Sequence, residues 1–346
     1  MDSLRNIAMV QKTIGEPPLL LALGPLLTFT QIYFLLPASF PLCLAWGGII
    51  VSKTYLILNL ICQDYLSDRA ATDPTFRTLP IILGDQNEQC RDAHVQSLVA
   101  RFQLYAALLS GIFSAVVAPY LGALSDRVGR KKIIAFSTLG MFIEDIICIV
   151  IGNYPQTISV YWLLAGNVID GLCGSFTAVM TVSLAYASDS TPPERRNVAI
   201  GYFHGTLFAG IAIGPILAGL LMKLTGTILI TFYFSIGCHL FFLIFLFACI
   251  PESLSKGRQM HAREKYRITN EETQEQSWWS TIKNYNLFEP LSILRPTGPG
   301  TSNALRRNLS LLAAIDTIMF GVAMGAMGVL LIYPQYIFGW DPIQAS

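Results

Sequence analysis

Seven long apolar stretches constrain this chain more than any other feature of its sequence. They cover residues 37–62, 97–124, 133–152, 159–187, 198–222, 228–250 and 309–338. A helix needs roughly 20 mostly apolar residues to cross the hydrocarbon core of a bilayer, and each stretch is long enough. Charged residues make up only 13% of the chain, against about 25% in a typical soluble domain. The sequence therefore predicts an all-α polytopic membrane protein embedded in a lipid bilayer.

Basic residues in the connections predict which side of the membrane each loop faces. With the N-terminus in the cytosol, the short inner segments hold 8 Lys and Arg residues and the outer segments hold 4. Because cytoplasmic loops carry an excess of Lys and Arg, this count predicts a cytoplasmic N-terminus. It also places the long polar loop 251–308 in the cytosol. The membrane is expected to be the plasma membrane or an internal membrane such as that of the vacuole.

Residues 19–36 form a further uncharged run that does not fit this count. If the run crossed the membrane as a separate helix, every later segment would change sides, and the basic cluster at 127–132 would face outward. Pro25, Pro37 and Pro41 also break the run, and proline disfavours a regular helix. We therefore predict that residues 1–36 form an N-terminal segment with an interfacial or re-entrant apolar stretch. A gene-model artefact is the alternative.

A string rich in glycine and arginine joins the second and third apolar stretches. It reads Gly-Ala-Leu-Ser-Asp-Arg-Val-Gly-Arg-Lys-Lys, with Gly122, Asp126, Arg127, Gly129, Arg130 and Lys131 as its defining residues. A tight reversal between two helices needs glycine where the backbone crowds or takes a positive φ. A carboxylate in such a turn can accept hydrogen bonds from backbone or arginine donors. The string resembles the signature loop of the major facilitator superfamily, which implies that it gates the conformational change of a transporter.

Two further helices bear on this resemblance. The fifth stretch carries Gly210, Gly214, Pro215 and Gly219, which resemble the superfamily's fifth-helix motif. Small residues at this spacing let two helix backbones approach closely, and proline bends the helix. Residues 185–196 are similar to the matching segment of tetracycline-efflux and proton-coupled folate carriers. In the fourth stretch, however, Asn167 and Asp170 stand where the superfamily motif has arginine and glutamine, so that arginine's proton-relay role does not carry over.

The resemblance implies an architecture of two six-helix halves with the substrate bound between them near the membrane midplane. Residues 37–250 are then the first bundle, 251–308 the cytoplasmic linker, and 309–346 the first helix of an incomplete second bundle. The implied function is proton-coupled transport of a small solute by alternating access, without cofactor, enzymatic activity or nucleic-acid partner. Since the chain stops after the seventh stretch, we expect either a fragment or truncated gene model, or a shortened relative.

Two other functions remain as alternatives. A truncated, non-transporting membrane protein that acts through partners would share every motif described above. A seven-helix receptor is the second alternative, but the predicted cytoplasmic N-terminus and the long loop after the sixth helix count against it. The sequence contains none of the hydrolase, zinc-protease or phosphate-binding motifs that would indicate an enzyme.

Several polar residues lie inside the apolar stretches, where a charge is costly and is usually functional. Lys53, Asp145 and Asp170 lie well inside their helices. Because a buried lysine needs a counter-ion, we expect Lys53 to pair with Asp145 or Asp170. Asn167, one turn before Asp170, and Asp316 of the seventh stretch complete the candidates for a substrate or proton pathway, with Asp170 taking up and releasing the proton. The structural alternative is a fixed salt bridge that holds the helices in register.

The remaining titratable residues of the helices are weaker candidates. Adjacent residues on a helix point about 100° apart, so Glu144 and its neighbour cannot both face one partner. His204 and His239 are expected to be packed and hydrogen-bonded. The seven cysteines are spread singly, which argues against a metal site. Cys62 and Cys90 bracket the outer polar loop and either form a disulfide or remain two free thiols.

Overall fold

The computed structural model describes residues 18–73, 88–271 and 301–338, and within them the chain is helical and contains no strand. Six spans among these residues are long and apolar enough to cross a membrane. Their helices are α2 (Pro18–Thr72), α3 (Ala93–Val128), α4 (Arg130–Asn153), α5 (Trp162–Leu172) continued by α6 (Ser175–Asp189), α7 (Arg196–Thr225) and α8 (Leu229–Ala248). The all-α polytopic prediction and its first six spans are confirmed.

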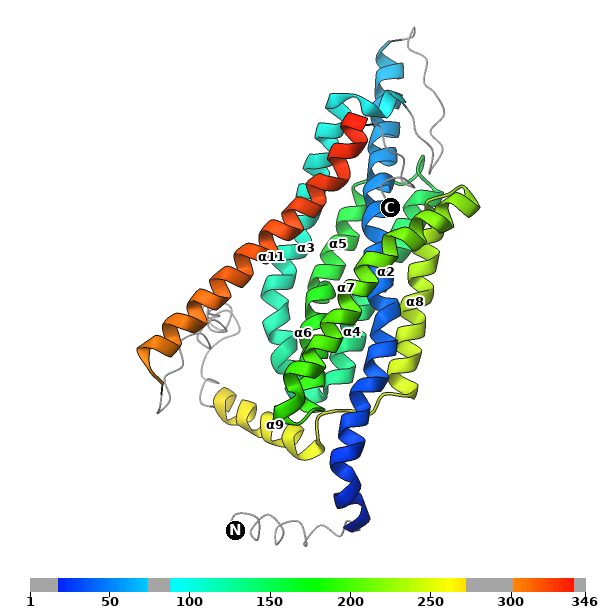
Figure 1. Ribbon diagram of the computed structural model, residues 1–346. Helices are drawn as coiled ribbons and strands as arrows, with labels where there is room; N and C mark the ends of the chain where they lie inside the picture. Colours follow the sequence, from blue (N-terminus) through cyan, green and yellow to red (C-terminus); the bar gives the residue numbers. More distant parts are fainter. Residues whose placement is uncertain (1–17, 74–87, 272–300, 339–346) are drawn as a thin grey trace.

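These helices stand side by side as an upright bundle (Figure 1). α2 packs mainly against α7 and α8, while α4 packs against α5, α6 and α8, and α3 packs against α5. Short 3-10 turns precede α3 (η1, Glu88–Arg91) and α7 (η2, Pro193–Arg195). At one end of the bundle the polar helix α9 (Lys256–Glu271) runs across the helix ends, beside the turn between α3 and α4. We call this the signature-loop end, and the opposite end, where α2 meets η1, the disulfide end.

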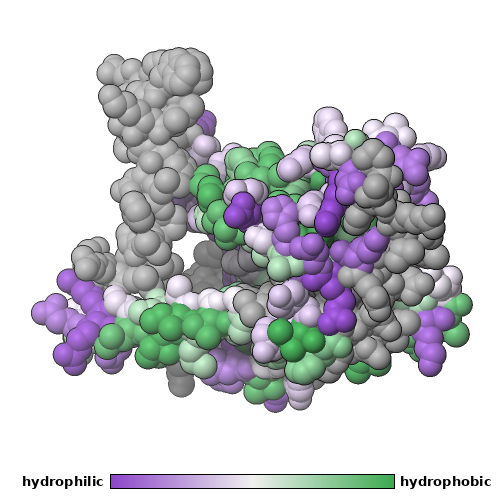
Figure 2. Space-filling view, turned by 90° about the horizontal axis from the view of Figure 1, so that it is seen from above, coloured by the Kyte–Doolittle hydropathy of each residue, from purple (hydrophilic) through white to green (hydrophobic). Residues whose placement is uncertain are grey.

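Apolar side chains cover the flanks of the bundle, as expected for a protein whose solvent is lipid. Exposed residues include Phe208, Ile216 and Leu224 on α7, and Ile244 and Phe247 on α8. Figure 2 looks along the bundle from the disulfide end and shows hydrophilic residues gathered there, with hydrophobic residues beside them. A surface of this kind is stable only when the flanks face hydrocarbon.

α2 is longer than the predicted first span. It runs unbroken through 55 residues from Pro18 to Thr72, which corresponds to about 80 Å of helix, whereas the hydrocarbon core is only ~30 Å thick. Residues 19–36 therefore continue the first helix instead of forming a separate element, although Pro25 and Pro37 lie within it. Proline is tolerated in such helices because neighbouring groups satisfy the freed carbonyls. How this extension lies relative to the bilayer stays a prediction.

The most extensive helix contact in the bundle joins α2 to α7. Gly47 and Gly48 of α2 face Gly210 and Gly214 of α7. A Cβ atom on Gly214 would lie 2.7 Å from the Gly48 backbone nitrogen and 3.0 Å from the Gly47 carbonyl carbon. Glycine is needed here because the two backbones touch directly, as the fifth-helix motif predicted. In the same helix Gly219 is buried one turn beyond Pro215.

Two apolar layers form the core of the bundle, one toward each end. The layer at the disulfide end includes Leu56, Val99 and Phe232, and the layer at the signature-loop end includes Ile134 and Tyr186. The polar residues of the cavity described below come from the stretches of helix between these layers. The packing therefore places a polar cavity about midway along the bundle.

Cys62 and Cys90 form a disulfide, with their Cα atoms 5.5 Å apart. The bond ties α2, ten residues before its end at Thr72, to η1, directly before α3. The other five cysteines are free. Of the two predicted alternatives, the structure therefore contains the disulfide.

The seventh apolar stretch lies within α11 (Asn303–Phe338), which is helical as predicted. Figure 1 shows it inclined to the bundle, near α3 at the disulfide end. There, the Arg91 guanidinium donates to the Tyr336 carbonyl at 3.3 Å. That α11 crosses the membrane, and that it begins a second bundle after a linker, both stay predictions.

Candidate functional site

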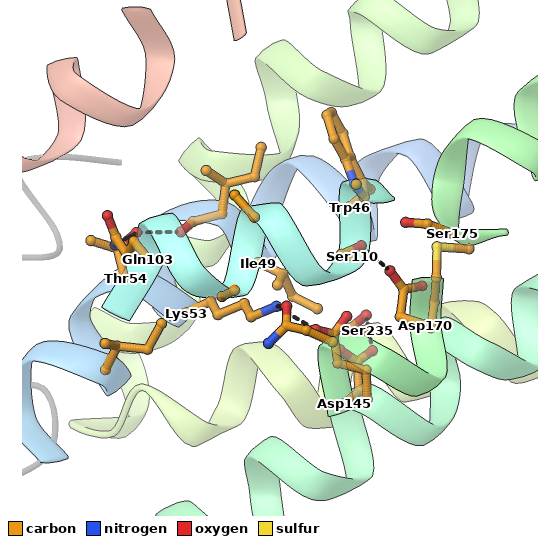
Figure 3. Close-up of a pocket in the computed structure, with 18 of the residues that line it drawn as sticks. Trp46, Ile49, Lys53, Thr54, Gln103, Ser110, Asp145, Asp170, Ser175 and Ser235 are labelled. Carbon is orange, nitrogen blue, oxygen red and sulfur yellow. Dashed lines mark hydrogen bonds and ion pairs between the residues drawn. The ribbon is translucent and has the colours of Figure 1, made fainter. Parts of the chain in front are cut away.

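A polar cavity of about 440 Å³ opens inside the six-span bundle. Its walls come from α2, α3, α4, α5, α6 and α8. The polar side chains that line it are Lys53, Thr54, Gln103, Ser110, Glu144, Asp145, Asn167, Asp170, Ser175, Ser235 and His239. Figure 3 shows these side chains converging from different helices. Four of the five predicted pathway residues thus line one cavity, and Asp316, exposed on α11, is not among its lining residues.

The counter-ion of Lys53 is Glu144, and the predicted pairing with Asp145 or Asp170 is wrong. The Lys53 ammonium forms an ion pair with the Glu144 carboxylate and donates a hydrogen bond to Asn167 Oδ1 at 3.1 Å. Adjacent residues on α4 do point in different directions, as the sequence implied. Packing decided which of the two carboxylates faces α2, and Glu144 holds that position.

Asp145 faces α8 instead. Its Oδ2 accepts a hydrogen bond from the Ser235 hydroxyl at 2.7 Å and lies 3.2 Å from His239 Nδ1. All three residues are buried. The sequence did not predict this cluster, and His239 was expected to be an ordinary packed and hydrogen-bonded residue. The available signal was the spacing of Ser235 and His239, four residues apart and so on one face of an otherwise apolar helix.

Asp170 lies at the end of α5, where the fourth span breaks. The Ser110 hydroxyl donates to its Oδ2 at 3.1 Å, while Oδ1 is buried without a hydrogen-bond partner among the described residues. The span was predicted as one helix over 159–187, but α5 ends at Leu172 and α6 begins at Ser175. Ser175 takes a φ of 53°, a left-handed conformation that costs a non-glycine residue energy and is often found at functional sites.

The signature loop turns at one glycine, although the sequence pattern predicted that its glycines in general are needed; Gly122 lies inside α3, where a Cβ atom would meet nothing within 4 Å. Gly129 has a φ of 105° and joins α3 directly to α4. The Arg130 guanidinium binds the Asp126 carboxylate at 2.6 Å and the Asp189 carboxylate, at the end of α6, at 3.1 Å. Glu252 accepts a hydrogen bond from the Arg130 backbone N–H at 2.9 Å. These contacts connect the second, third and fourth spans and the segment after the sixth, so a relative movement of these helices must break some of them.

Helix α9 packs on the same loop. The Arg263 guanidinium donates to the Arg127 carbonyl at 2.7 Å, and the Arg127 guanidinium lies 3.8 Å from the centre of the Tyr266 ring. Lys131 donates to the Ile250 carbonyl at the end of the sixth span. The residues that follow the bundle are therefore in direct contact with its signature loop.

Comparison with known proteins shows which family has sequences similar to this chain. A family model described as Major Facilitator Superfamily matches residues 91–346. The MFS-type transporter avaJ of Aspergillus versicolor is 31% identical over 307 residues, which cover 89% of this chain and 56% of that protein. An uncharacterized membrane protein of Schizosaccharomyces pombe is 24% identical over 327 residues, or 90% of this chain and 47% of that protein. The chain therefore spans about half the length of these curated relatives.

A bacterial relative and a solved structure are also similar. The class H tetracycline resistance protein of Pasteurella multocida is 30% identical over 172 residues, which cover 49% of this chain and 38% of that protein. The crystal structure of the human organic anion transporter MFSD10 aligns with a TM-score of 0.57 at 16% identity, covering 90% of this chain and 67% of that one. At this identity the structural match concerns the fold alone.

Proposed function

The chain belongs to the Major Facilitator Superfamily, and from this premise we propose that it moves a small solute across a membrane by alternating access. The observation that carries the proposal is the open polar cavity midway along the bundle, with an apolar layer toward each end of the bundle. Transporters bind their substrates near the membrane midplane, often beside a broken helix, and here α5 and α6 form such a break. Membership of this superfamily favours transport over the receptor alternative.

Asp170 is the proposed proton carrier. The residue is only 4% exposed, and its carboxylate has one oxygen without a hydrogen-bond partner among the described residues. A buried charge that lacks full compensation is costly, so the group gains stability when a proton or a bound donor neutralises it. Lys53 is already paired with Glu144, which leaves Asp170 without that ammonium as a direct partner. Proton binding at Asp170 would then couple the occupancy of the cavity to a pH gradient.

The proposed orientation has the signature-loop end in the cytosol, with the N-terminus on that side. Two independent observations support it. Basic residues concentrate at the signature-loop end, as cytoplasmic loops do. The Cys62–Cys90 disulfide lies at the opposite end, and disulfides persist in oxidising compartments. That end would face the cell exterior or the lumen of an organelle such as the vacuole.

Vesicle labelling tests this orientation. Cys62 and Cys90 are buried, so the reporter is a Ser67→Cys variant, whose position is exposed near the disulfide end of α2. In sealed vesicles that expose the extracellular or lumenal face, a membrane-impermeant maleimide is expected to label this added cysteine. Vesicles of the reverse orientation should leave it unlabelled until detergent is added. The unmodified chain is the control for the five free cysteines. Labelling of the added cysteine only in the reverse orientation would contradict the proposal.

Transport is tested with the purified chain in liposomes under an imposed pH gradient. The probes are tetracycline, chosen because a relative is a tetracycline resistance protein, the cationic dye rhodamine 123 and the anionic dye fluorescein. We expect at least one probe to accumulate, and a protonophore to abolish the accumulation. Asp170→Asn should lower the rate of transport about tenfold or more. This is the loss expected when one hydrogen bond to a charged group is removed, with that free energy converted into a fold-change.

The matched control is Asp68→Asn, which makes the same chemical change at an exposed position of α2 that does not line the cavity. Its rate should stay within about twofold of the unmodified chain, since exposed substitutions rarely matter more. No movement of any probe above that in protein-free liposomes would overturn the proposed function. Equal losses in both variants would remove Asp170 from the coupling step.

A further inference from the structure

The cavity also indicates what kind of solute it accepts. Resting on the proposed transport function, we infer that the substrate is an organic cation with an apolar or aromatic body, and that its protonated amine binds the free oxygen of Asp170. Three features of the cavity carry this inference: the net charge of its lining, which of its polar atoms are already hydrogen-bonded, and the aromatic wall beside Asp170.

Charge is the first feature. Among the described residues that line the cavity, three carboxylates, Glu144, Asp145 and Asp170, face a single lysine, Lys53. His239 adds at most one further positive charge. With every carboxylate ionised, the lining is therefore negative by two charges when the histidine is neutral and by one when it is protonated. In a medium of low dielectric constant such an excess attracts a cation and repels an anion.

The second feature is which polar atoms are already occupied. Lys53 donates to Glu144 and to Asn167. Asp145 accepts from Ser235 and lies beside His239. Two buried atoms of the lining have no hydrogen-bond partner among the described residues, Asp170 Oδ1 and His239 Nδ1. His239 Nδ1 already lies 3.2 Å from the Asp145 carboxylate, so the acceptor left for a ligand belongs to Asp170, and the ligand group that satisfies it best is a charged N–H donor.

The third feature is the wall beside Asp170. Trp46 lines the cavity and stacks on Phe176, with ring centres 4.4 Å apart and an angle of 8° between the ring planes. Ile49 and Met141 add apolar surface. Figure 3 shows Trp46, Ser110 and Asp170 at the same side of the cavity. An aromatic face attracts a cation through its quadrupole and also packs against an apolar ring.

Size distinguishes an organic cation from a bare metal ion. A volume of about 440 Å³ lies in the range of pockets that hold drug-sized ligands. A metal ion would need several ligands converging on one point, and the described residues contain no group of three or more His, Cys, Asp or Glu side chains placed to hold one. An amine that carries a ring system satisfies the charge and fills the volume.

Two dyes built on one xanthene scaffold test the inference directly. Binding of cationic rhodamine 123 and anionic fluorescein to the purified full chain is measured by fluorescence anisotropy in detergent. Rhodamine 123 is expected to bind at least about tenfold more tightly than fluorescein. Asp170→Asn should weaken rhodamine 123 binding by about tenfold or more and should not weaken fluorescein binding, because only the cation uses the lost charge.

Asp68→Asn is again the control and should leave both affinities unchanged, since Asp68 does not line the cavity. Comparable affinities for the dyes, tighter binding of fluorescein, or no binding of either dye up to about 1 mM would overturn the inference. So would unchanged rhodamine 123 affinity in Asp170→Asn whose thermal unfolding shows that it is folded. If Asp170→Asn does not fold, the preference of the unmodified chain between the two dyes still decides the charge of the substrate.

The dyes also separate this inference from the proposed function. Rhodamine 123 that binds through Asp170 but does not move in liposomes would support the cation site and count against transport. Transport of fluorescein without transport of rhodamine 123 would support the transport function and overturn the substrate class.

Discussion

Gly214→Ala is expected to destabilise the bundle by about 3 kcal/mol or more, at the upper end of the cost of overpacking. The added methyl would meet the backbone of α2 at Leu44, Gly47 and Gly48. Backbone atoms cannot rotate away as a flexible side chain can, so α2 and α7 must separate along their shared interface. The free energy of unfolding of the detergent-solubilised protein, measured by denaturant titration or heating, gives the size of the effect.

Gly205→Ala on the same helix is the matched control. A Cβ atom at Gly205 meets nothing within 4 Å, and alanine favours a helix over glycine by up to about 1 kcal/mol. This variant should therefore be as stable as the unmodified chain or slightly more stable. Similar losses in the two variants would show that the destabilisation comes from the loss of glycine itself and not from the contact with α2.

Lys53→Met is expected to cost about 3 kcal/mol because it leaves the Glu144 carboxylate buried without its counter-ion. The side chains of the pair are only 23% and 15% exposed, so water screens them weakly. Replacing both residues, as Lys53→Met/Glu144→Met, should restore most of the stability, since an apolar pair of similar volume needs no compensation. A double-mutant cycle on the free energy of unfolding measures this coupling.

Lys53→Met/Asp145→Asn serves as the comparison, because Asp145 faces Ser235 and His239 across the interface with α8. We expect no rescue in that double variant. A larger coupling energy with Asp145 than with Glu144 would falsify the observed pairing and restore the pairing predicted from the sequence.

The signature loop and the cavity share structural elements, which bears on how the proposed alternating access would operate. α5 and α6 form one span: α5 carries Asp170 toward the cavity, and α6 ends at Asp189, which binds Arg130 of the signature loop. Under the proposed mechanism, a change in the occupancy of Asp170 would act on the same broken span that the loop contacts. The irregular backbone at Ser175 is the natural point for the two halves of this span to move relative to each other.

Much of the candidate site could be predicted from the sequence because charges inside apolar helices are rare. Lys53, Asp145, Asn167 and Asp170 attract notice for that reason, and all four line the cavity. Ser110, Trp46 and Ser235 could not be singled out, since serine and tryptophan are common in membrane helices. Only their convergence on the same space gives them significance.

The sequence by itself determined that this chain is a helical membrane protein, where its first six spans lie, and that the chain reverses within residues 122–132. Hydrophobicity and backbone freedom are properties of a residue and its near neighbours, so they can be read along the chain. The tertiary structure alone decided that Glu144 is the partner of Lys53, that Asp145 meets His239, and that Asp170 keeps a free oxygen. Pairing depends on how each helix is rotated about its axis, and that rotation is set by packing against neighbours distant in sequence.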